Sequence, residues 1–229
     1  MQSHSRPAFL SWRALGLATA LAAGALAGAS AAQADIIVDP AGDFLATYSG
    51  PLNGDLDVLS AGAVQNGTDL VLTATLNGDI GTPPGAVYVF GVNRGAGLPL
   101  LTFGAPSVGA GVNFDAVAVL TPGGASFVAL ILPTAQAPIA LNDVSFVGSK
   151  FRAVIPLSDL PTNGFATSDY LYNLWPRSGL GVNTQISDFA PDASSFAANV
   201  PEPGAWAMMI VGFGLLGAMG RRRNRAAIA

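Results

Sequence analysis

The clearest structural signal in this chain is LVLTATL, at residues 70–76. Leucine or alanine occupies every second position, while Val71, Thr73 and Thr75 fill the positions between them. Successive side chains of a β-strand point to opposite faces of a sheet. The alternation therefore predicts a half-buried strand, with its leucines in a core.

Other short apolar runs recur along the chain, separated by Gly, Pro, Asn and Asp, which are typical of turns. Two of them, residues 143–147 and 151–155, flank Gly148-Ser149, which predicts a type II′ hairpin turn. The remaining predicted strands are Ala86–Val92, Phe114–Leu120, Phe127–Leu132 and Tyr170–Trp175. Pro176 should end the last of these strands, because proline donates no hydrogen bond to a sheet.

This pattern predicts the fold class. A helical period is absent from the middle of the chain, apart from one expected turn at residues 157–160. Eight or more strands with Gly and Pro turns predict an all-β domain, an antiparallel β-sandwich of jelly-roll type, over residues 35–191. Residues 192–203, rich in Ala, Ser and Pro, are interpreted as a linker.

Composition excludes several classes of site. The chain has no cysteine, which excludes disulfides, thiolate zinc sites and cysteine nucleophiles, and its one histidine is His4. Without that histidine the mature chain has no Ser-His-Asp triad and no His-ligated metal. Residues 35–199 carry thirteen aspartates, no glutamate and only four basic residues. Such an acidic domain repels phosphate backbones, so we expect no nucleic-acid partner.

The N-terminus has the composition of a secretory leader. Arg6 and Arg13 precede an Ala- and Leu-rich run at residues 14–29, which ends in an A-x-A pattern. These features predict a signal peptide over residues 1–34, removed by signal peptidase. The residues expected at the cleavage site are Ala32, Ala34 and Asp35. The alternative is a membrane anchor that stays attached.

An uncharged segment lies near the C-terminus, from Gly204 to Gly220. As a helix this segment is about 25 Å long, close to the hydrocarbon thickness of a bilayer, so we expect a transmembrane helix. Arg221-Arg222-Arg223-Asn224-Arg225 then begins a basic tail over residues 221–229. Because basic flanks stay in the cytoplasm, the central domain should lie on the far side of the inner membrane.

Just before this segment stands VPEP, at residues 200–203. Proline has a fixed φ and no N–H, so the two prolines of VPEP should keep the backbone extended and outside any helix or sheet. An extended backbone beside a membrane is a form that a processing enzyme can bind. Glu202 between the prolines is the only glutamate in the chain.

The tail as a whole resembles a PEP-CTERM sorting signal, and PEPGAWA at residues 201–207 resembles its PEPxxWA variant. In that family, found in Gram-negative bacteria that make extracellular polysaccharide, the signal implies cleavage near Pro-Glu-Pro by an exosortase, a multi-spanning membrane enzyme. The resemblance implies transient anchoring in the inner membrane, then a place at the cell surface or in the extracellular matrix. A simple membrane anchor is the alternative. The residues expected to form the signal are Val200, Pro201, Glu202, Pro203, Trp206, Arg221, Arg222 and Arg223.

The central domain is similar to the DOMON and family 9 carbohydrate-binding β-sandwich modules. Three short segments carry this resemblance: DPAGD at residues 39–43, DLDV at 55–58 and VYVFGVNR at 87–94. It implies a ligand-binding sandwich, often with a structural calcium ion.

The densest group of oxygen ligands also lies in these segments. Short carboxylates suit turns and hard cations, and calcium takes six to eight oxygen ligands. The stretch at residues 53–57 lacks the Gly and Glu of an EF-hand, so that specific motif fails. Solvated turn aspartates are the alternative to a calcium site. The candidate ligands are Asp39, Asp43, Asp55 and Asp57.

Three further features carry a prediction. Trp175 beside Arg177 has the composition of a stacking platform for a sugar ring, and the alternative is that Trp175 covers the core. Asp115 is expected to face outward from its strand. Residues 91–97 are glycine-rich but follow no phosphate-binding pattern.

The sequence thus predicts an exported, non-catalytic protein of the cell surface or exopolysaccharide matrix. One alternative is a calcium-assisted carbohydrate-binding module. The other is a secreted glycan hydrolase, which needs two carboxylates about 5–9 Å apart. No pair of aspartates in the sequence is marked for that role.

Overall fold

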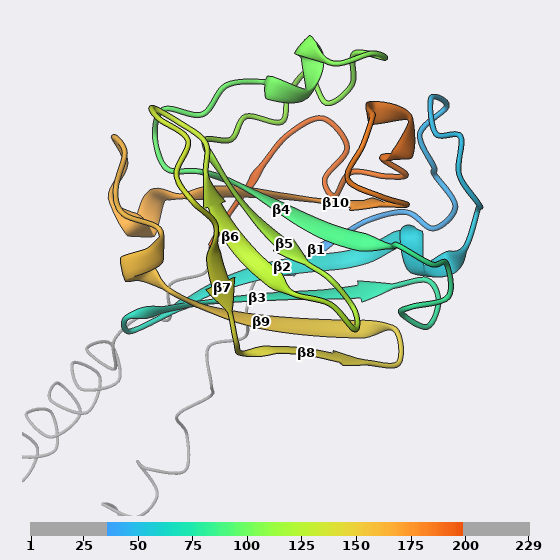
Figure 1. Ribbon diagram of the computed structural model, residues 1–229, viewed down its shortest axis with the longest axis horizontal. Coiled ribbons are helices and arrows are strands. Elements are labelled where there is room, and N and C mark those ends of the chain that lie inside the picture. Colours follow the sequence, from blue (N-terminus) through green and yellow to red (C-terminus); the bar gives the residue numbers. More distant parts are fainter. Residues whose placement is uncertain (1–35, 199–229) are drawn as a thin grey trace, which may run out of the picture. The chain divides into compact units, whose positions relative to one another are not determined.

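Two antiparallel sheets make up residues 36–198, the part of the chain that the computed structural model describes (Figure 1). The five-stranded sheet has the order β1 (Ile36–Val38), β2 (Val58–Asn66), β3 (Asp69–Leu76), β9 (Lys150–Pro156) and β8 (Val144–Val147). The six-stranded sheet has the order β11 (Phe196–Ala197), β10 (Leu171–Arg177), β4 (Val87–Asn93), β5 (Ala116–Leu120), β6 (Ser126–Leu130) and β7 (Ile139–Leu141).

Helical structure within these residues is limited to short 3-10 turns, so the all-β, two-sheet prediction is confirmed. No helix within residues 36–198 has the length and apolar composition needed to cross a membrane. The turn expected at residues 157–160 is one of the 3-10 turns. They are η2 (Gly54–Leu56), η3 (Leu100–Phe103), η4 (Leu157–Asp159), η5 (Thr167–Asp169) and η6 (Asn183–Gln185).

The alternating segment at residues 70–76 lies in β3, between β2 and β9. Its leucines and its alanine are buried and the residues between them are half-exposed, as the alternation predicts. The expected hairpin at Gly148-Ser149 joins β8 to β9, with Val147 opposite Lys150. Gly148 has a φ of 56°, which glycine adopts without steric cost.

The order of the strands differs from the prediction of a jelly roll. Strands β1 to β3 follow one another in one sheet, and β4 to β7 follow one another in the other. The chain then returns to the first sheet for β8 and β9, and to the second for β10 and β11. These are meanders joined by a few crossings, whereas a jelly roll consists of two Greek keys. The jelly-roll prediction is therefore wrong.

The main core lies between the two sheets. Phe151 on β9 packs against Tyr88 and Phe90 on β4, with ring centroids 5.2 Å and 6.0 Å apart. The leucines of β3 and the alanines of β5 also point into this space. Each buried leucine or phenylalanine contributes about 1.5–3 kcal/mol of hydrophobic free energy, so this layer holds the sheets together.

A second, smaller core covers the outer face of the six-stranded sheet. Val87, Val89 and Trp175 point outward from β4 and β10 and are covered by Phe114 and Phe189 from the loops. This is why every residue of β4 but its last is buried, while buried and half-exposed residues alternate along β3. A strand buried on both faces has a continuous apolar sequence.

Two boundaries differ from their predictions. Strand β10 continues through Pro176 to Arg177. The carbonyl of Pro176 accepts the N–H of Ser187 at 3.1 Å, so this residue's hydrogen-bonding side faces away from β4 and its missing N–H removes no bond to that strand. Residues 192–203 are not all linker either, because β11 pairs with β10 and Phe196 packs on Tyr172. The sandwich extends at least to residue 198.

The predicted signal peptide at residues 1–34, the transmembrane helix at 204–220 and the basic tail at 221–229 lie outside the described residues. So do the cleavage site at Ala32, Ala34 and Asp35 and the motif that begins at Val200.

Candidate functional site

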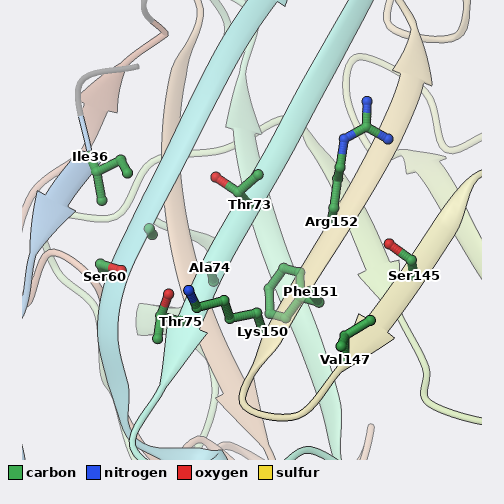
Figure 2. A pocket seen from close by; sticks show the side chains of 11 residues that line it. Ile36, Ser60, Thr73, Ala74, Thr75, Ser145, Val147, Lys150, Phe151 and Arg152 are labelled. Carbon is green, nitrogen blue, oxygen red and sulfur yellow. The ribbon is translucent and has the colours of Figure 1, made fainter. Parts of the chain in front are cut away.

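The outer face of the five-stranded sheet carries an open groove of about 370 Å³ (Figure 2). Most of its lining is apolar, while Ser60, Thr73 and Thr75 add hydroxyl groups and Lys150 and Arg152 add positive charge. Within residues 36–198 these are the two exposed basic residues, since the other two arginines are buried. The groove thus places polar and cationic groups on the face that the alternation of β3 leaves open.

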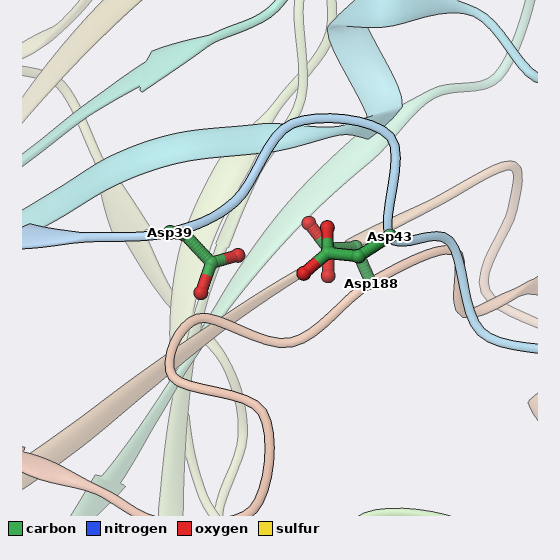
Figure 3. Close-up of side chains that lie close together, drawn as sticks. All are labelled: Asp39, Asp43 and Asp188. Atoms are coloured by element: carbon green, nitrogen blue, oxygen red, sulfur yellow. The ribbon is translucent and has the colours of Figure 1, made fainter.

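Three aspartates from distant parts of the chain meet at the edge of the sandwich. Asp39 directly follows β1, Asp43 lies in the next turn, and Asp188 lies in the loop that leaves β10. One carboxylate oxygen from each lies within 4.8 Å of those of the other two. Figure 3 shows the carboxylate of Asp39 directed toward Asp43 and Asp188.

These carboxylates are buried with few hydrogen-bond donors. Asp39 is only 6% exposed, and its Oδ2 has no hydrogen-bond partner. Both carboxylate oxygens of Asp43 also have none. Asp188 is completely buried and accepts one backbone N–H on each oxygen, from Val58 at 2.9 Å and from Phe189 at 2.6 Å.

Burial and mutual repulsion make ionisation of this group costly. Burial, followed by the charges of Asp188 and Asp43, raises the pKa of Asp39 to about 8. Burial raises the pKa of Asp188 to about 7 and also raises that of Asp43. The ion pairs within residues 36–198 are Arg94–Asp115 and Arg152–Asp143, so no basic side chain there neutralises the three aspartates.

The structure brings only part of the predicted ligand set together. It brings Asp39 and Asp43 together, and Asp57 lies close enough for its charge to raise the pKa of Asp39. Asp57 also uses its Oδ2 to accept hydrogen bonds from the backbone of Gly42 and from Asn77. Asp55 is not part of the three-carboxylate group that could hold an ion.

Asp55 has another role in the structure. Its Oδ2 accepts the backbone N–H groups of Gly81 and Thr82 at 3.1 Å and the hydroxyl of Tyr88 at 3.4 Å. It therefore organises the turn before β4, and its prediction as a ligand beside Asp39 and Asp43 is wrong. Asp188 is not predicted from the sequence, because no local pattern connects it with residues 39–57.

The predicted sugar platform at Trp175 and Arg177 is also wrong. Trp175 is 1% exposed and packs on Phe114 and Phe189, so neither face of its ring is open to a sugar. Arg177 is 8% exposed and donates hydrogen bonds to the carbonyls of Gly181 and Val182. The alternative interpretation, that Trp175 packs in a core, is confirmed.

Asp115 does not face outward but is completely buried. Its Oδ1 accepts Nε of Arg94 at 2.9 Å, and its Oδ2 accepts the backbone N–H of Ala96 and the amide of Asn163. Asn93 Oδ1 accepts the N–H groups of Gly95 and Gly97. The glycine-rich loop therefore already uses these N–H groups internally, which agrees with the absence of a phosphate-binding motif.

Comparison with known families concerns the C-terminal segment. Residues 199–223 match the family model of the PEP-CTERM protein-sorting motif. Comparison with curated proteins gave no match, and comparison with solved structures gave none either, so the similarity to DOMON modules is not confirmed. The matched segment contains VPEP and the first three arginines of the tail. The motif implies export, transient anchoring in the membrane and processing by an exosortase. Residues 199–223 of this chain are a PEP-CTERM protein-sorting motif.

Proposed function

We propose that this chain is a non-catalytic protein of the cell surface or exopolysaccharide matrix, delivered there by cleavage of its C-terminal motif. The match of residues 199–223 to the sorting motif carries the proposal. A non-catalytic role fits a domain without Cys or His between residues 36 and 198, whose open groove combines apolar surface with hydroxyl and cationic side chains. The β-sandwich is then the domain that is delivered, and residues 199–229 are its sorting signal.

The sorting step has two parts. The uncharged segment at residues 204–220 first stops in the membrane, and the arginines after it stay in the cytoplasm. The exosortase then cuts near Pro201-Glu202-Pro203, where we expect the two prolines to keep the backbone extended. Ala197 ends β11 only four residues before Pro201, so the start of Pro201-Glu202-Pro203 lies within about 15 Å of the end of that strand.

The test compares processing of variants in the native host. Glu202→Ala and deletion of residues 221–225 should each leave uncleaved, membrane-bound chain. Asp79→Asn, which removes an exposed charge from the sandwich, is the matched control and should be processed normally. Cell fractionation and the mass of the C-terminus measure the outcome. Normal release of the sandwich from both motif variants would refute the proposal.

For the β-sandwich itself, the groove supports binding of an acidic polysaccharide as its function. Its hydroxyl groups suit hydrogen bonds to a glycan, and Lys150 and Arg152 suit a carboxylate or sulfate on it. We expect the double variant Lys150→Ala/Arg152→Ala to lose retention on the host's exopolysaccharide, with Asp79→Asn unaffected. Equal retention of all three proteins would argue against the groove. Release of reducing ends from the polysaccharide would instead favour the hydrolase alternative.

A further inference from the structure

We propose that Asp39, Asp43 and Asp188 bind one calcium ion, which fastens the segment after β1 to the loop after β10. The three carboxylates supply oxygen ligands only, which selects a hard cation over zinc or copper. Oxygens bound to one Ca²⁺ lie 2.3–2.6 Å from it, so any two of them are at most about 5 Å apart. The three oxygens within 4.8 Å of one another meet this condition without movement of the backbone.

The unused oxygens are the second reason for a cation. A buried carboxylate without a hydrogen bond or a positive partner is costly. Asp39 Oδ2 is buried and has no donor, and the carboxylate of Asp39 is directed toward the other two aspartates (Figure 3), while Asp43 has no donor on either oxygen. Asp57 adds another buried oxygen without a donor beside them. A divalent cation supplies the positive charge that these residues lack.

The location explains what the ion does. Residues 39–53 form no strand, and the backbone N–H groups of Leu45 and Ser49 hold them to the carbonyls of Ser187 and Thr184. These bonds link the same two segments that the aspartates join. Strand β1 before them is short and its Val38 is 83% exposed, so it has few contacts of its own. Calcium would therefore anchor the N-terminal end of the sandwich.

The first test is calcium binding by the full chain, purified in mild detergent and treated with a chelator. Isothermal titration should show one Ca²⁺ per chain, with a Kd of about 10⁻⁴–10⁻³ M, the range of extracellular calcium modules. Asp39→Asn and Asp43→Asn should weaken binding at least tenfold, and the exposed control Asp79→Asn should not. Calcium at 100 times its Kd should raise the Tm by about 5–10 °C.

The second test separates a metal site from a structural cluster. Without calcium, Asp39→Asn should have a higher Tm than the unsubstituted chain, since on folding the buried Asp39 must either take up a proton or carry a charge that its neighbours repel. Calcium should no longer raise the Tm of this variant. Asp188→Asn is less suitable because Asp188 also accepts two backbone N–H groups. The proposal would be overturned if the chain bound no Ca²⁺ at 10 times about 10⁻³ M. It would also be overturned if Asp39→Asn and Asp43→Asn bound Ca²⁺ unchanged, or if the chain bound Mg²⁺ with equal affinity. These binding results do not depend on whether the motif is processed.

Discussion

Replacing Arg94 by methionine should destabilise the sandwich more than any other single loss of a positive charge within residues 36–198. Its guanidinium is buried and makes three short bonds: Nε to Asp115 Oδ1 at 2.9 Å, and its terminal nitrogens to the carbonyls of Pro161 at 2.8 Å and Leu132 at 2.9 Å. It thus joins the segment after β4 to three other parts of the chain.

The magnitude follows from what the substitution leaves behind. Asp115 stays buried with only neutral donors, and the carbonyls of Pro161 and Leu132 each lose one hydrogen bond. Breaking a buried ion pair from one side costs about 3–5 kcal/mol. For a domain of this size, 1 kcal/mol corresponds to about 2–4 °C in Tm, so we expect Arg94→Met to lower the Tm by about 6–20 °C.

Arg152→Met is the matched control. Arg152 pairs with Asp143 at 3.7 Å, and both side chains are about half-exposed or more. An exposed pair contributes about 0–1 kcal/mol, so the shift in Tm should stay below about 4 °C. Thermal and urea unfolding followed by circular dichroism measure both variants. Equal shifts for the two variants would show that the network around Asp115 does not hold the loops as argued.

Three further predictions follow from the same structure. The raised pKa values of Asp39 and Asp188, about 8 and 7 against 3.8, mean that the calcium-free folded state keeps protons that the unfolded chain releases. Its urea midpoint should therefore fall from pH 5 to pH 8, and a constant midpoint would contradict the shifts. Gly91→Ala places a Cβ 2.5 Å from the ring of Trp175 and should cost about 1–3 kcal/mol in unfolding experiments. Six Gly and Ser residues inserted after Ala198 should speed cleavage in a pulse-chase experiment, and slower cleavage would show that the exosortase requires the sandwich close by.

The sequence was sufficient where a signal is local. Strand β3 alternates because one of its faces lies on the core and the other on the open groove. The hairpin at Gly148 depends on two residues and the runs beside them. The sorting motif likewise depends on neighbouring residues, which is why it was identified from the tail alone.

The errors arise where the surroundings come from elsewhere in the chain. Trp175 is buried because loops carrying Phe114 and Phe189 fold over the outer face of its sheet, and no pattern near residue 175 predicts those loops. Asp115 faces Arg94 across a strand pair. Pro176 is tolerated because its hydrogen-bonding side faces a loop. Each of these requires knowledge of which side of a strand is covered.

The loop that carries Asp188 connects the proposed calcium site with the segment that leads to the sorting motif. The amide of Asn173 on β10 donates to the carbonyls of Pro191 and Ser194, and β11 follows directly. The segment from residue 188 to 198 thus carries one proposed calcium ligand at its start and leads into the sorting motif at its end. Any force on the motif reaches the sandwich through the two residues of β11. The proposed calcium ion at Asp188 should therefore limit such a detachment to the segment between residue 188 and the motif.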